Sequence, residues 1–448
     1  MGVLIIILSC NEIEKTKLCL ESIRCAVEYS YCHIIIADND SSDGTVEWAV
    51  EQKDVTVYEI RDEIMPWGKV INSIIEDYGS DQHVMIIEAR SVLVPGALTG
   101  MLSVLDERSA VICPINFSGD ILTIPDNVIE SYDDALKDVR EKGNSQESGR
   151  AMELHTAAAL FHKNIFEKVG KFDERLFTLK YIYKDFSIRM LQDEFEIRVA
   201  KNCFVYEIEE EIIYTSLLEA DRLLMKLKYG MNYFNMISNG LIVRHLLDNV
   251  SRDGIKRPRI LEIGCDLGAT LFAIGEKISD SELYGIELNG AAAKIARNVA
   301  DVLEYDVEKE KLEYEDEFFD YMIFGDVLEH LHNPEKTLGY LKRFLKDNGK
   351  IIASIPNLMH ISVIKELLKG NFEYTDCGLL DRTHIHLFTY NEIVKMLDRL
   401  GFKKYDILSK NEEINENDKE LIRSLLVLQP EAKEFMYSSF QYLVIACK

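Results

Sequence analysis

The chain has 448 residues, of which 47% are hydrophobic, and this length and composition are typical of two domains with buried cores. The formal net charge of -26 excludes a basic surface for nucleic acid or for an anionic membrane. Nine scattered cysteines without a C-x-x-C pair favour reduced thiols, which are typical of a cytoplasmic protein. No apolar run reaches the roughly 20 residues of a membrane-spanning helix, so we expect no transmembrane segment.

The first part of the chain alternates hydrophobic strands with a helical pattern. Residues 3–8 predict a strand, residues 14–28 a helix, and residues 34–37 a second strand. This alternation predicts an α/β fold with a mainly parallel sheet, in which ligands bind at the carboxyl ends of the strands. Polar segments follow both strands at that edge: Ser9-Cys10-Asn11 after the first, and residues 38–45 after the second.

Both polar segments resemble the nucleotide-sugar-binding half of inverting family 2 glycosyltransferases, which have the GT-A fold. The resemblance implies that Asp38 contacts the base of the nucleotide and that Asp43 shapes the loop around its ribose. Ser9 and Asn11 belong to the same implied site. Residues 83–98 match the family's strand that normally ends in an Asp-rich metal motif.

Three residues stand at the position of that metal motif, namely Glu88, Ala89 and Arg90. The charge of a diphosphate leaving group is usually neutralised by a divalent cation held on carboxylates, and an arginine would repel this cation. The arginine could instead pair directly with the phosphates. The resemblance therefore implies a nucleotide-sugar donor, whereas the divalent cation stays open.

Residues 172–177 and 184–189 resemble the acceptor side of the same family. Asp185 matches the family's second acid, and Ile182 and Tyr183 stand where its catalytic acidic pair is expected. A loop insertion that shifted the register by two residues would make Asp185 the general base. Active sugar transfer and binding without transfer both stay open for this domain.

We expect three regions along the chain: a glycosyltransferase-like domain over residues 1–215, a helical connector over 216–250 and a second domain over 251–448. Residues 121–149 are acidic and polar, which predicts a surface insertion in the first domain.

The second domain begins with a strand, a tight glycine turn and a helix over residues 259–271. Gly264 and Gly268 allow the turn to take positive φ and to approach a ligand closely. The carboxylate of Glu262, ahead of the turn, suits a ligand with an amino acid cation better than a pyrophosphate. The next strand ends at Glu287, which can accept hydrogen bonds from both hydroxyls of a ribose.

With Asp306 at a similar interval further on, this pattern resembles the S-adenosylmethionine site of class I methyltransferases, which have a Rossmann-like seven-stranded sheet. The resemblance implies that the turn lines the methionine end of the cofactor, and that the next two strand ends hold its ribose and its adenine. The residues concerned are Glu262, Gly264, Cys265, Asp266 and Gly268 for methionine, Glu287 and Leu288 for ribose, and Asp306 and Val307 for adenine. Asp266 replaces the family's middle glycine, and Asp tolerates a left-handed backbone better than most residues. We expect the later part of the connector to cover this pocket.

A strand over residues 319–324 leads to Asp326 and His330, which the topology of an open sheet places beside the reaction centre. Residues 378–389 resemble a segment of methyltransferases associated with bacterial surface glycans. A sugar hydroxyl is a very weak acid, so its methylation needs a positioned base. Histidine suits this task near neutral pH.

His384 is the first candidate for this base, oriented by Asp381 or another carboxylate, and His330 is the second. If the segment is extended, His386 points the same way as His384 because strand side chains alternate. Arg382 could pair with an internal acid or with a phosphate of the acceptor. Because no third ligand stands at a suitable spacing, the sequence predicts no metal site here.

The rest of the second domain is expected to contain a helix over residues 334–345 and strands over 350–354, 404–408 and 440–446. The last of these is expected as the antiparallel edge of the sheet. The acidic stretch over residues 411–420 predicts a solvated loop.

These patterns predict a bifunctional enzyme that uses S-adenosylmethionine to methylate a sugar of a surface glycan, a lipid-linked precursor or a glycoprotein. One alternative is a monofunctional methyltransferase whose degenerate glycosyltransferase domain serves as a binding or scaffolding module. Another is a non-catalytic assembly factor. The sequence leaves the sugar, the methylated atom and self-association open.

Overall fold

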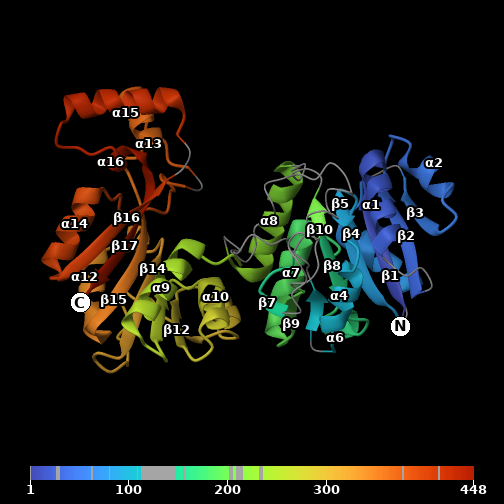
Figure 1. The fold of residues 1–448 in the computed structure, drawn as a ribbon, viewed down its shortest axis with the longest axis horizontal. Helices are drawn as coiled ribbons and strands as arrows, with labels where there is room; N and C mark the ends of the chain where they lie inside the picture. The colour runs from blue at the N-terminus through green and yellow to red at the C-terminus, as the bar shows by residue number, and fades with distance from the viewer. Residues whose placement is uncertain are drawn as a thin grey trace. The chain divides into compact units, whose positions relative to one another are not determined.

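The computed structural model describes residues 2–26, 31–61, 64–79, 81–107, 109–112, 148–154, 157–200, 205–207, 215–231, 236–375, 378–411 and 414–448. The chain forms two compact units, Met1–Phe234 and Asn235–Lys448 (Figure 1). Most of the insertion expected over residues 121–149 lies outside the described residues.

The stretch expected as one connector over residues 216–250 forms two helices, which belong to different units. Helix α8 (Thr215–Tyr229) belongs to the first unit and α9 (Gly240–Asp253) to the second. Gly230 follows α8 with a φ of 69°, in the left-handed region that commonly ends a helix. The side chain of Asn239 starts α9 by accepting a hydrogen bond from the Ile242 N–H at 3.2 Å.

The first unit is built on an eight-stranded sheet with the order β3-β2-β1-β4-β8-β6-β9-β7. Its strands are β1 Val3–Ser9, β2 Cys32–Asn39, β3 Val55–Ile60, β4 His83–Glu88, β6 Ser109–Ile112, β7 Ser148–Ala151, β8 Ala158–Phe161 and β9 Glu196–Ala200, and β5 Ser91–Leu93 and β10 Val205–Glu207 form a separate antiparallel pair. The helices are α1 Ile13–Ala26, α2 Thr45–Val50, α3 Trp67–Tyr78, α4 Ala97–Val104, α6 Ile165–Lys168, α7 Leu179–Gln192 and α8. Strand β1 is buried along its whole length, as expected for a central strand covered on both faces.

The register of these strands brings the predicted polar segments to one edge. Strands β3, β2, β1 and β4 are parallel neighbours, with Ser9 opposite Asp38 and Leu8 opposite Glu88. The carboxyl ends of β1, β2 and β4 therefore lie side by side. The predicted α/β fold is confirmed for this unit.

The second unit has a seven-stranded sheet with the order β13-β12-β11-β14-β15-β17-β16. Its strands are β11 Arg259–Ile263, β12 Glu282–Glu287, β13 Asp301–Glu304, β14 Phe319–Gly325, β15 Leu345–Pro356, β16 Lys404–Asn411 and β17 Ser439–Cys447. The helices are α9, α10 Ala269–Lys277, α11 Gly290–Ala296, α12 Pro334–Leu341, α13 Ile361–Leu368, α14 Tyr390–Arg399, α15 Glu416–Leu428 and α16 Phe435–Ser438, with short 3-10 helices η2 Leu328–His330 and η3 Lys342–Phe344. The predicted Rossmann-like sheet is confirmed.

The position of the antiparallel strand differs from the prediction. Strand β17 runs antiparallel to both neighbours and lies between β15 and β16, so β16 forms the edge. The physical reason is the polarity of the two strands. Strand β17 is mostly buried, whereas every residue of β16 is exposed or only partly buried, and an edge strand can leave one side to water.

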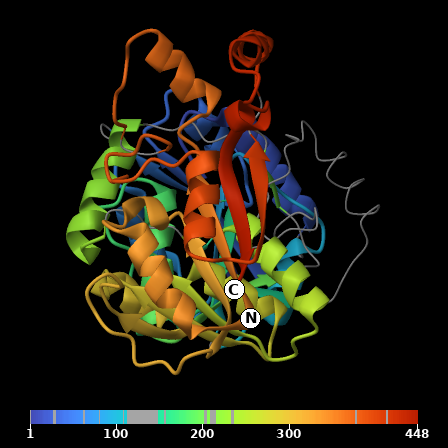
Figure 2. The ribbon, with the colours of Figure 1, turned by 90° about the vertical axis from the view of Figure 1, so that its left-hand side faces the viewer.

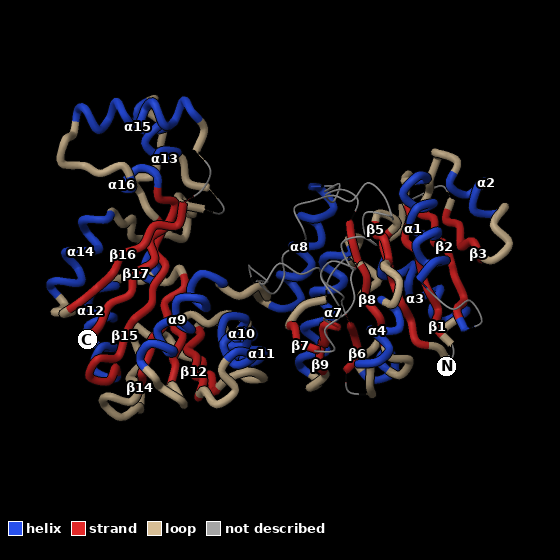
Figure 3. Tube along the Cα trace, in the orientation of Figure 1, coloured by secondary structure: helices blue, strands red, loops and turns tan. Residues whose placement is uncertain are grey.

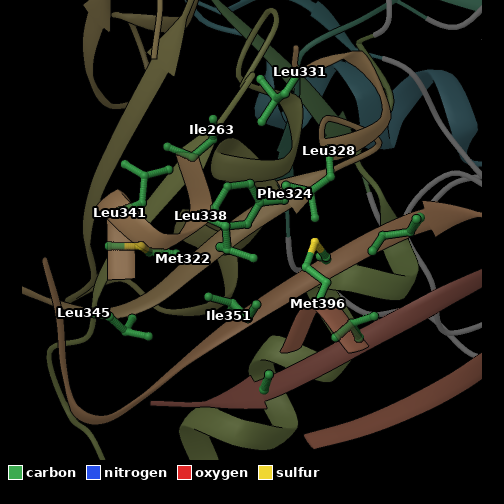
Figure 4. Close-up of a cluster of buried hydrophobic side chains, with 14 of the residues drawn as sticks. Ile263, Met322, Phe324, Leu328, Leu331, Leu338, Leu341, Leu345, Ile351 and Met396 are labelled. Atoms are coloured by element: carbon green, nitrogen blue, oxygen red, sulfur yellow. The ribbon is translucent and has the colours of Figure 1, made fainter. Parts of the chain in front are cut away.

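Helices cover both faces of this sheet (Figure 3). Alternate side chains of β14 point to opposite layers, as the period of a strand requires. Met322 and Phe324 belong to the cluster with α12 and α14, where they meet Leu338 and Met396 (Figure 4). Tyr321 and Ile323 pack against α9 and α10. This two-sided burial fixes β14 in the centre of the unit.

The acidic stretch predicted as a loop over residues 411–420 contains the start of helix α15. Asn415 starts the helix by accepting a hydrogen bond from the Asp418 N–H at 2.9 Å, and acids in the first turn suit the helix dipole. The buried Ile422 of α15 packs with Ile361 of α13 and Tyr437 of α16. Figures 1 and 2 show these helices beyond the end of the sheet at which β15 ends and β17 begins. The packing of the apolar residues of α15, and not the acidic composition of its first turn, therefore explains why this segment is helical.

None of the helices in the described ranges combines the length and apolar character that crossing a membrane would require.

Candidate active sites

The glycine turn after β11 has the backbone that the sequence predicts. Gly264, Asp266 and Gly268 all have positive φ, of 66°, 46° and 85°. A Cβ on Gly264 would lie 2.7 Å from Cγ2 of Val327, and one on Gly268 would lie 2.7 Å from Cγ2 of Val299. Both glycines are therefore required by packing as well as by φ, and Asp266 takes the left-handed conformation in place of the middle glycine.

Glu262 supplies a buried carboxylate just ahead of this turn. It is 5% exposed, and its Oε2 has no hydrogen-bond partner among the described residues. Burial raises the pKa of this carboxyl to about 8, against 4.5 in water, and the nearby Asp266 and Glu287 add to the shift. An unpaired buried carboxylate of this kind fits a ligand that brings an ammonium group.

Glu287, at the end of β12, contacts both the glycine turn after β11 and the loop that follows β12. Its Oε2 accepts a hydrogen bond from the Asp266 N–H at 2.9 Å, and its Oε1 accepts one from the Asn289 N–H at 2.8 Å. A carboxylate has about four acceptor sites, so both oxygens retain capacity for ribose hydroxyls. The carboxylate is partly exposed at the edge where the cofactor is expected.

The other predicted cofactor contacts differ in their accessibility. Cys265 is 4% exposed and packs against Gly285, so it can offer a ligand its backbone but not its thiol. Val307 is buried, whereas Leu288 is 69% exposed. The carboxylate of Asp306 accepts hydrogen bonds from Lys309 Nζ at 2.7 Å and from the Glu308 N–H at 3.0 Å, and the Lys309 ammonium is the main cause of its lowered pKa.

Asp326 follows β14 with a φ of 54° and is fixed by the neighbouring strands. Its Oδ1 accepts hydrogen bonds from Ser354 Oγ at 2.9 Å and from Gln441 Nε2 at 2.8 Å. The start of α9 lies at the same edge, where the Asn239 N–H donates to Thr270 Oγ1 at 3.2 Å. Helix α9 therefore begins beside the predicted methionine end of the pocket.

Two candidate bases, His330 and His384, meet at this edge. Their rings lie edge to face with centroids 4.9 Å apart. His330 Nδ1 lies 3.1 Å from the carbonyl oxygen of Thr383, and His384 Nδ1 lies 3.1 Å from that of Leu379. Because a carbonyl can only accept, each Nδ1 carries a proton, and Nε2 is the nitrogen that no backbone carbonyl contacts. Burial lowers the pKa of His330, which favours the neutral ring.

Glu329 is a residue of this cluster that the sequence did not single out. It is 0% exposed, and neither carboxylate oxygen has a hydrogen-bond partner among the described residues. Burial, with a smaller contribution from Asp326, raises its pKa well above the ordinary value. An acid next to a histidine directly after a buried strand was the available signal in the sequence.

The segment that carries His384 is not the extended strand that was expected. It consists of turns and irregular backbone, and His386 Nε2 contacts the carbonyl oxygen of His332 at 3.1 Å. The partner of His384 is therefore His330. Asp381 accepts hydrogen bonds from the Thr383 N–H at 2.8 Å and Oγ1 at 2.6 Å, which helps to orient the segment.

In the first unit, the predicted nucleotide site is built from two interlocked loops. Asn11, with a φ of 55°, donates its N–H to Ser41 Oγ, and its Oδ1 accepts from the Ser42 N–H, both at 2.8 Å. Asp43 Oδ2 accepts from the Ile13 N–H at 2.8 Å, which ties the second loop to α1. Ser9 is 1% exposed and its hydroxyl lies 2.8 Å from Thr16 Oγ1, so the hydroxyl takes part in a contact within the fold.

Asp38 keeps an unpaired oxygen at the end of β2. Its Oδ1 accepts from the Ser41 N–H at 3.0 Å, whereas its buried Oδ2 has no hydrogen-bond partner among the described residues. Burial raises its pKa. This acceptor fits a ligand that brings a hydrogen-bond donor, as the base of a nucleotide does.

Glu88 and Arg90, at the expected metal position, pair with each other. Arg90 Nε donates to Glu88 Oε2 at 2.9 Å and Nη2 donates to the same oxygen at 2.5 Å. The two residues line a cavity of about 170 Å³ with Cys10, Asn39 and Trp67. In the described residues of this unit, no three acidic, cysteine or histidine side chains gather closely enough to hold a metal ion.

Asp185, for which the sequence left the roles of second acid and general base open, lies among cations in the structure. It is 0% exposed and its carboxylate is held by Arg189 Nε at 2.9 Å, by Tyr229 Oη at 2.7 Å and by Lys228 Nζ. These contacts engage both carboxylate oxygens of Asp185. Lys228 and Tyr229 lie on α8, so Asp185 attaches this helix to α7.

Comparisons with known proteins agree with the division into two units. A family described as glycosyl transferase family 2 matches residues 4–170, and a family described as a methyltransferase domain matches residues 239–407. An uncharacterised protein of Methanocaldococcus jannaschii is 30% identical over 182 residues, which cover 39% of this chain and 80% of the relative. A malonyl-[acyl-carrier protein] O-methyltransferase of Geobacter sulfurreducens is 22% identical over 175 residues, and the chain spans 65% of its length.

A solved structure of an S-adenosylmethionine-dependent methyltransferase from Archaeoglobus fulgidus is similar over 50% of this chain and 99% of that chain, with 19% identity and a TM-score of 0.35. The sheet order of the second unit, its glycine turn and the family match at residues 239–407 together identify the methyltransferase domain. The chain is therefore a fusion that belongs to the family 2 glycosyltransferases through its first unit and to the class I S-adenosylmethionine-dependent methyltransferases through its second.

Proposed function

We propose that the protein methylates a hydroxyl group of a sugar in a surface glycan, a lipid-linked precursor or a glycoprotein. The observation that carries this proposal is the combination of two features in one chain. A glycosyltransferase fold, which handles sugars, is joined to a methyltransferase unit in which two imidazoles, of His330 and His384, meet next to the end of β14. A weakly acidic hydroxyl is the kind of acceptor that needs such groups.

The second unit has the groups that S-adenosylmethionine requires. Glu262 offers its unpaired oxygen to the ammonium group, Glu287 offers acceptors to the ribose, and Asp306 stands at the next strand end for the adenine amine. When bound, the cofactor supplies an electrophilic methyl group and leaves as a neutral thioether. The chain's own task is to align the acceptor and to help remove its proton. His384 is the first candidate for the base that accepts this proton, and His330 is the second.

For the first unit, the contacts favour binding of a nucleotide sugar without its transfer. The unpaired Oδ2 of Asp38 supports nucleotide binding. The Glu88–Arg90 pair leaves no carboxylate free of a cation at the metal position, and Asp185 is neutralised by Lys228 and Arg189. In this proposal the unit binds or positions the sugar that the second unit methylates, and the bifunctional enzyme is the alternative.

Mass spectrometry of surface glycans from cells with and without the gene tests the proposal. If the protein is a methyltransferase, glycans from cells without the gene should be lighter than those from cells with it by about 14 mass units, the mass of the CH₂ that methylation adds. Loss of a whole sugar residue would support the bifunctional alternative, and unchanged glycans would refute both.

Nucleotide-sugar binding by the full-length protein tests the role of the first unit. We expect calorimetry to detect a nucleotide sugar that binds wild type and not the Asp38→Ala variant, without measurable hydrolysis of the sugar. Hydrolysis that the same substitution abolishes would instead show a catalytic first unit.

A further inference from the structure

Glu329, His330 and His384 form a compact group that the cofactor contacts described above do not use. Glu329 and His330 lie on η2, which follows β14, and His384 lies in the segment between α13 and α14. One side-chain ligand atom of each residue lies within 4.8 Å of the corresponding atoms of the other two. Within the described parts of the chain, this is the one cluster of His, Cys, Asp and Glu with such spacing.

The three side chains bring atoms that can ligate a metal close to one another. Each imidazole has its Nδ1 proton committed to a backbone carbonyl, so Nε2 is the nitrogen that remains. Both oxygens of Glu329 are buried and lack hydrogen-bond partners in the described residues. Buried oxygens without a partner are unfavourable, and a cation held between Glu329 and the two partly exposed imidazoles would give them one.

We propose that Glu329, His330 and His384 bind a divalent transition-metal ion such as Zn²⁺, Mn²⁺ or Fe²⁺. Two imidazole nitrogens and one carboxylate are a ligand set that these ions prefer, and this set leaves coordination positions open for other groups. Ca²⁺ and Mg²⁺ prefer oxygen ligands and are expected to bind more weakly.

The surroundings hold the three ligands in place. The N–H groups of Ile385 and His386 donate to the Glu329 carbonyl at 2.8 and 3.0 Å, which attaches the His384 segment to η2. The Thr383 N–H donates a hydrogen bond to Asp381, and the Thr383 carbonyl contacts Nδ1 of His330 and so orients its ring. Carbonyls that fix the second nitrogen of a ligating histidine are a common feature of metal sites, because they set the tautomer and the ring orientation.

The catalytic role of this site refines the proposed function and rests on it, whereas cation binding itself does not. A bound divalent cation lowers the pKa of a hydroxyl that coordinates it, so the acceptor could lose its proton to water near neutral pH. His330 and His384 would then act as ligands and not as the base. The second unit would methylate its acceptor only with the cation present.

The test measures cation binding directly on the full-length protein. Protein stripped with EDTA and dialysed is titrated with Co²⁺, whose visible absorption reports nitrogen and oxygen ligands, and then with Zn²⁺ and Mg²⁺ by calorimetry. We expect one Co²⁺ or Zn²⁺ per chain and weaker binding of Mg²⁺. The variants Glu329→Gln and His384→Ala are expected to lower the affinity by at least about tenfold.

His386→Ala is the matched control, because His386 lies in the same segment but contacts the His332 carbonyl outside the cluster. It is expected to bind Co²⁺ like wild type. Glu329→Gln keeps the shape of the side chain, and circular dichroism checks the fold of each variant.

Binding of S-adenosylhomocysteine separates the two possible failures. If wild type binds this product and no cation, or if Glu329→Gln and His384→Ala bind Co²⁺ as tightly as wild type, the metal site is refuted and the methyltransferase function stands. If wild type binds Co²⁺ but not S-adenosylhomocysteine, the proposed function fails and the metal site stands.

Discussion

Replacement of Gly264 by alanine tests the glycine turn on which the cofactor site depends. The new side chain has two costs. A left-handed backbone costs an L-residue about 1–2 kcal/mol, and a Cβ at 2.7 Å from Val327 Cγ2 adds an overpacking cost of about 1–3 kcal/mol. The turn can relieve the second cost only by moving away from the position that the cofactor needs.

Gly254→Ala is the matched control for the first cost. Gly254 has a φ of 67°, against 66° for Gly264, but nothing lies within 4 Å of its ideal Cβ. Both variants should therefore lose about 1–2 kcal/mol through the backbone, which lowers Tm by about 2–8 °C for a unit of this size. Gly264→Ala alone should also bind S-adenosylhomocysteine about five- to 150-fold more weakly, from the additional 1–3 kcal/mol.

Isothermal titration calorimetry and thermal unfolding of the full-length protein measure these effects. The double variant Gly264→Ala with Val327→Ala should recover part of the affinity, because it removes the methyl group that the new Cβ meets. If Gly264→Ala and Gly254→Ala bind S-adenosylhomocysteine as wild type does, the turn does not hold the cofactor and the assignment of the site is wrong.

Three further predictions concern stability. Asp185→Asn leaves Arg189 and Lys228 without their buried anion, so urea unfolding should show a loss of about 3 kcal/mol. Glu262→Gln should change how stability depends on pH. Because the folded pKa of Glu262 is about 8 and the ordinary value is 4.5, the folded state keeps a proton that the unfolded state releases, and wild type should lose about 1.4 kcal/mol per pH unit relative to the variant between these values. Asn415→Ala removes the cap of α15, and amide exchange over residues 416–428 should accelerate as expected for a loss of about 1 kcal/mol.

Each of these predictions has an outcome that contradicts it. If Asp185→Asn were as stable as wild type and abolished nucleotide-sugar turnover, Asp185 would be a general base after all. Parallel stability curves for wild type and Glu262→Gln would mean that the carboxyl is ionised in the folded state. Unchanged exchange in Asn415→Ala would mean that packing of Ile422 alone holds the start of α15.

The turns around the cofactor site could be predicted because their determinants are local. The positive φ of Gly264, Asp266 and Gly268 depends on residues next to one another, and Glu287 lies at the end of a strand with an apolar run. Whether these residues contact S-adenosylmethionine stays a prediction.

The open points and the errors arose where distant segments meet. The sequence left the role of Asp185 open because Lys228 and Tyr229, which contact its carboxylate, lie 43 and 44 residues later in the chain. The edge position of residues 440–446 was wrong because strand order depends on which strand buries both faces. The start of α15 was hidden by the acids of its first turn, whereas Ile422 packs against residues outside the helix.

The sequence by itself determined the two α/β units and the polar residues at the carboxyl ends of their strands, because periodicity and turn chemistry act over a few residues. Only the tertiary structure decided which of those side chains share a site. It brings Glu329 and His330 to His384, and it directs the protons of both imidazoles toward backbone carbonyls. That arrangement depends on how the segment before α14 packs against η2, and such long-range packing leaves no periodic pattern in the chain.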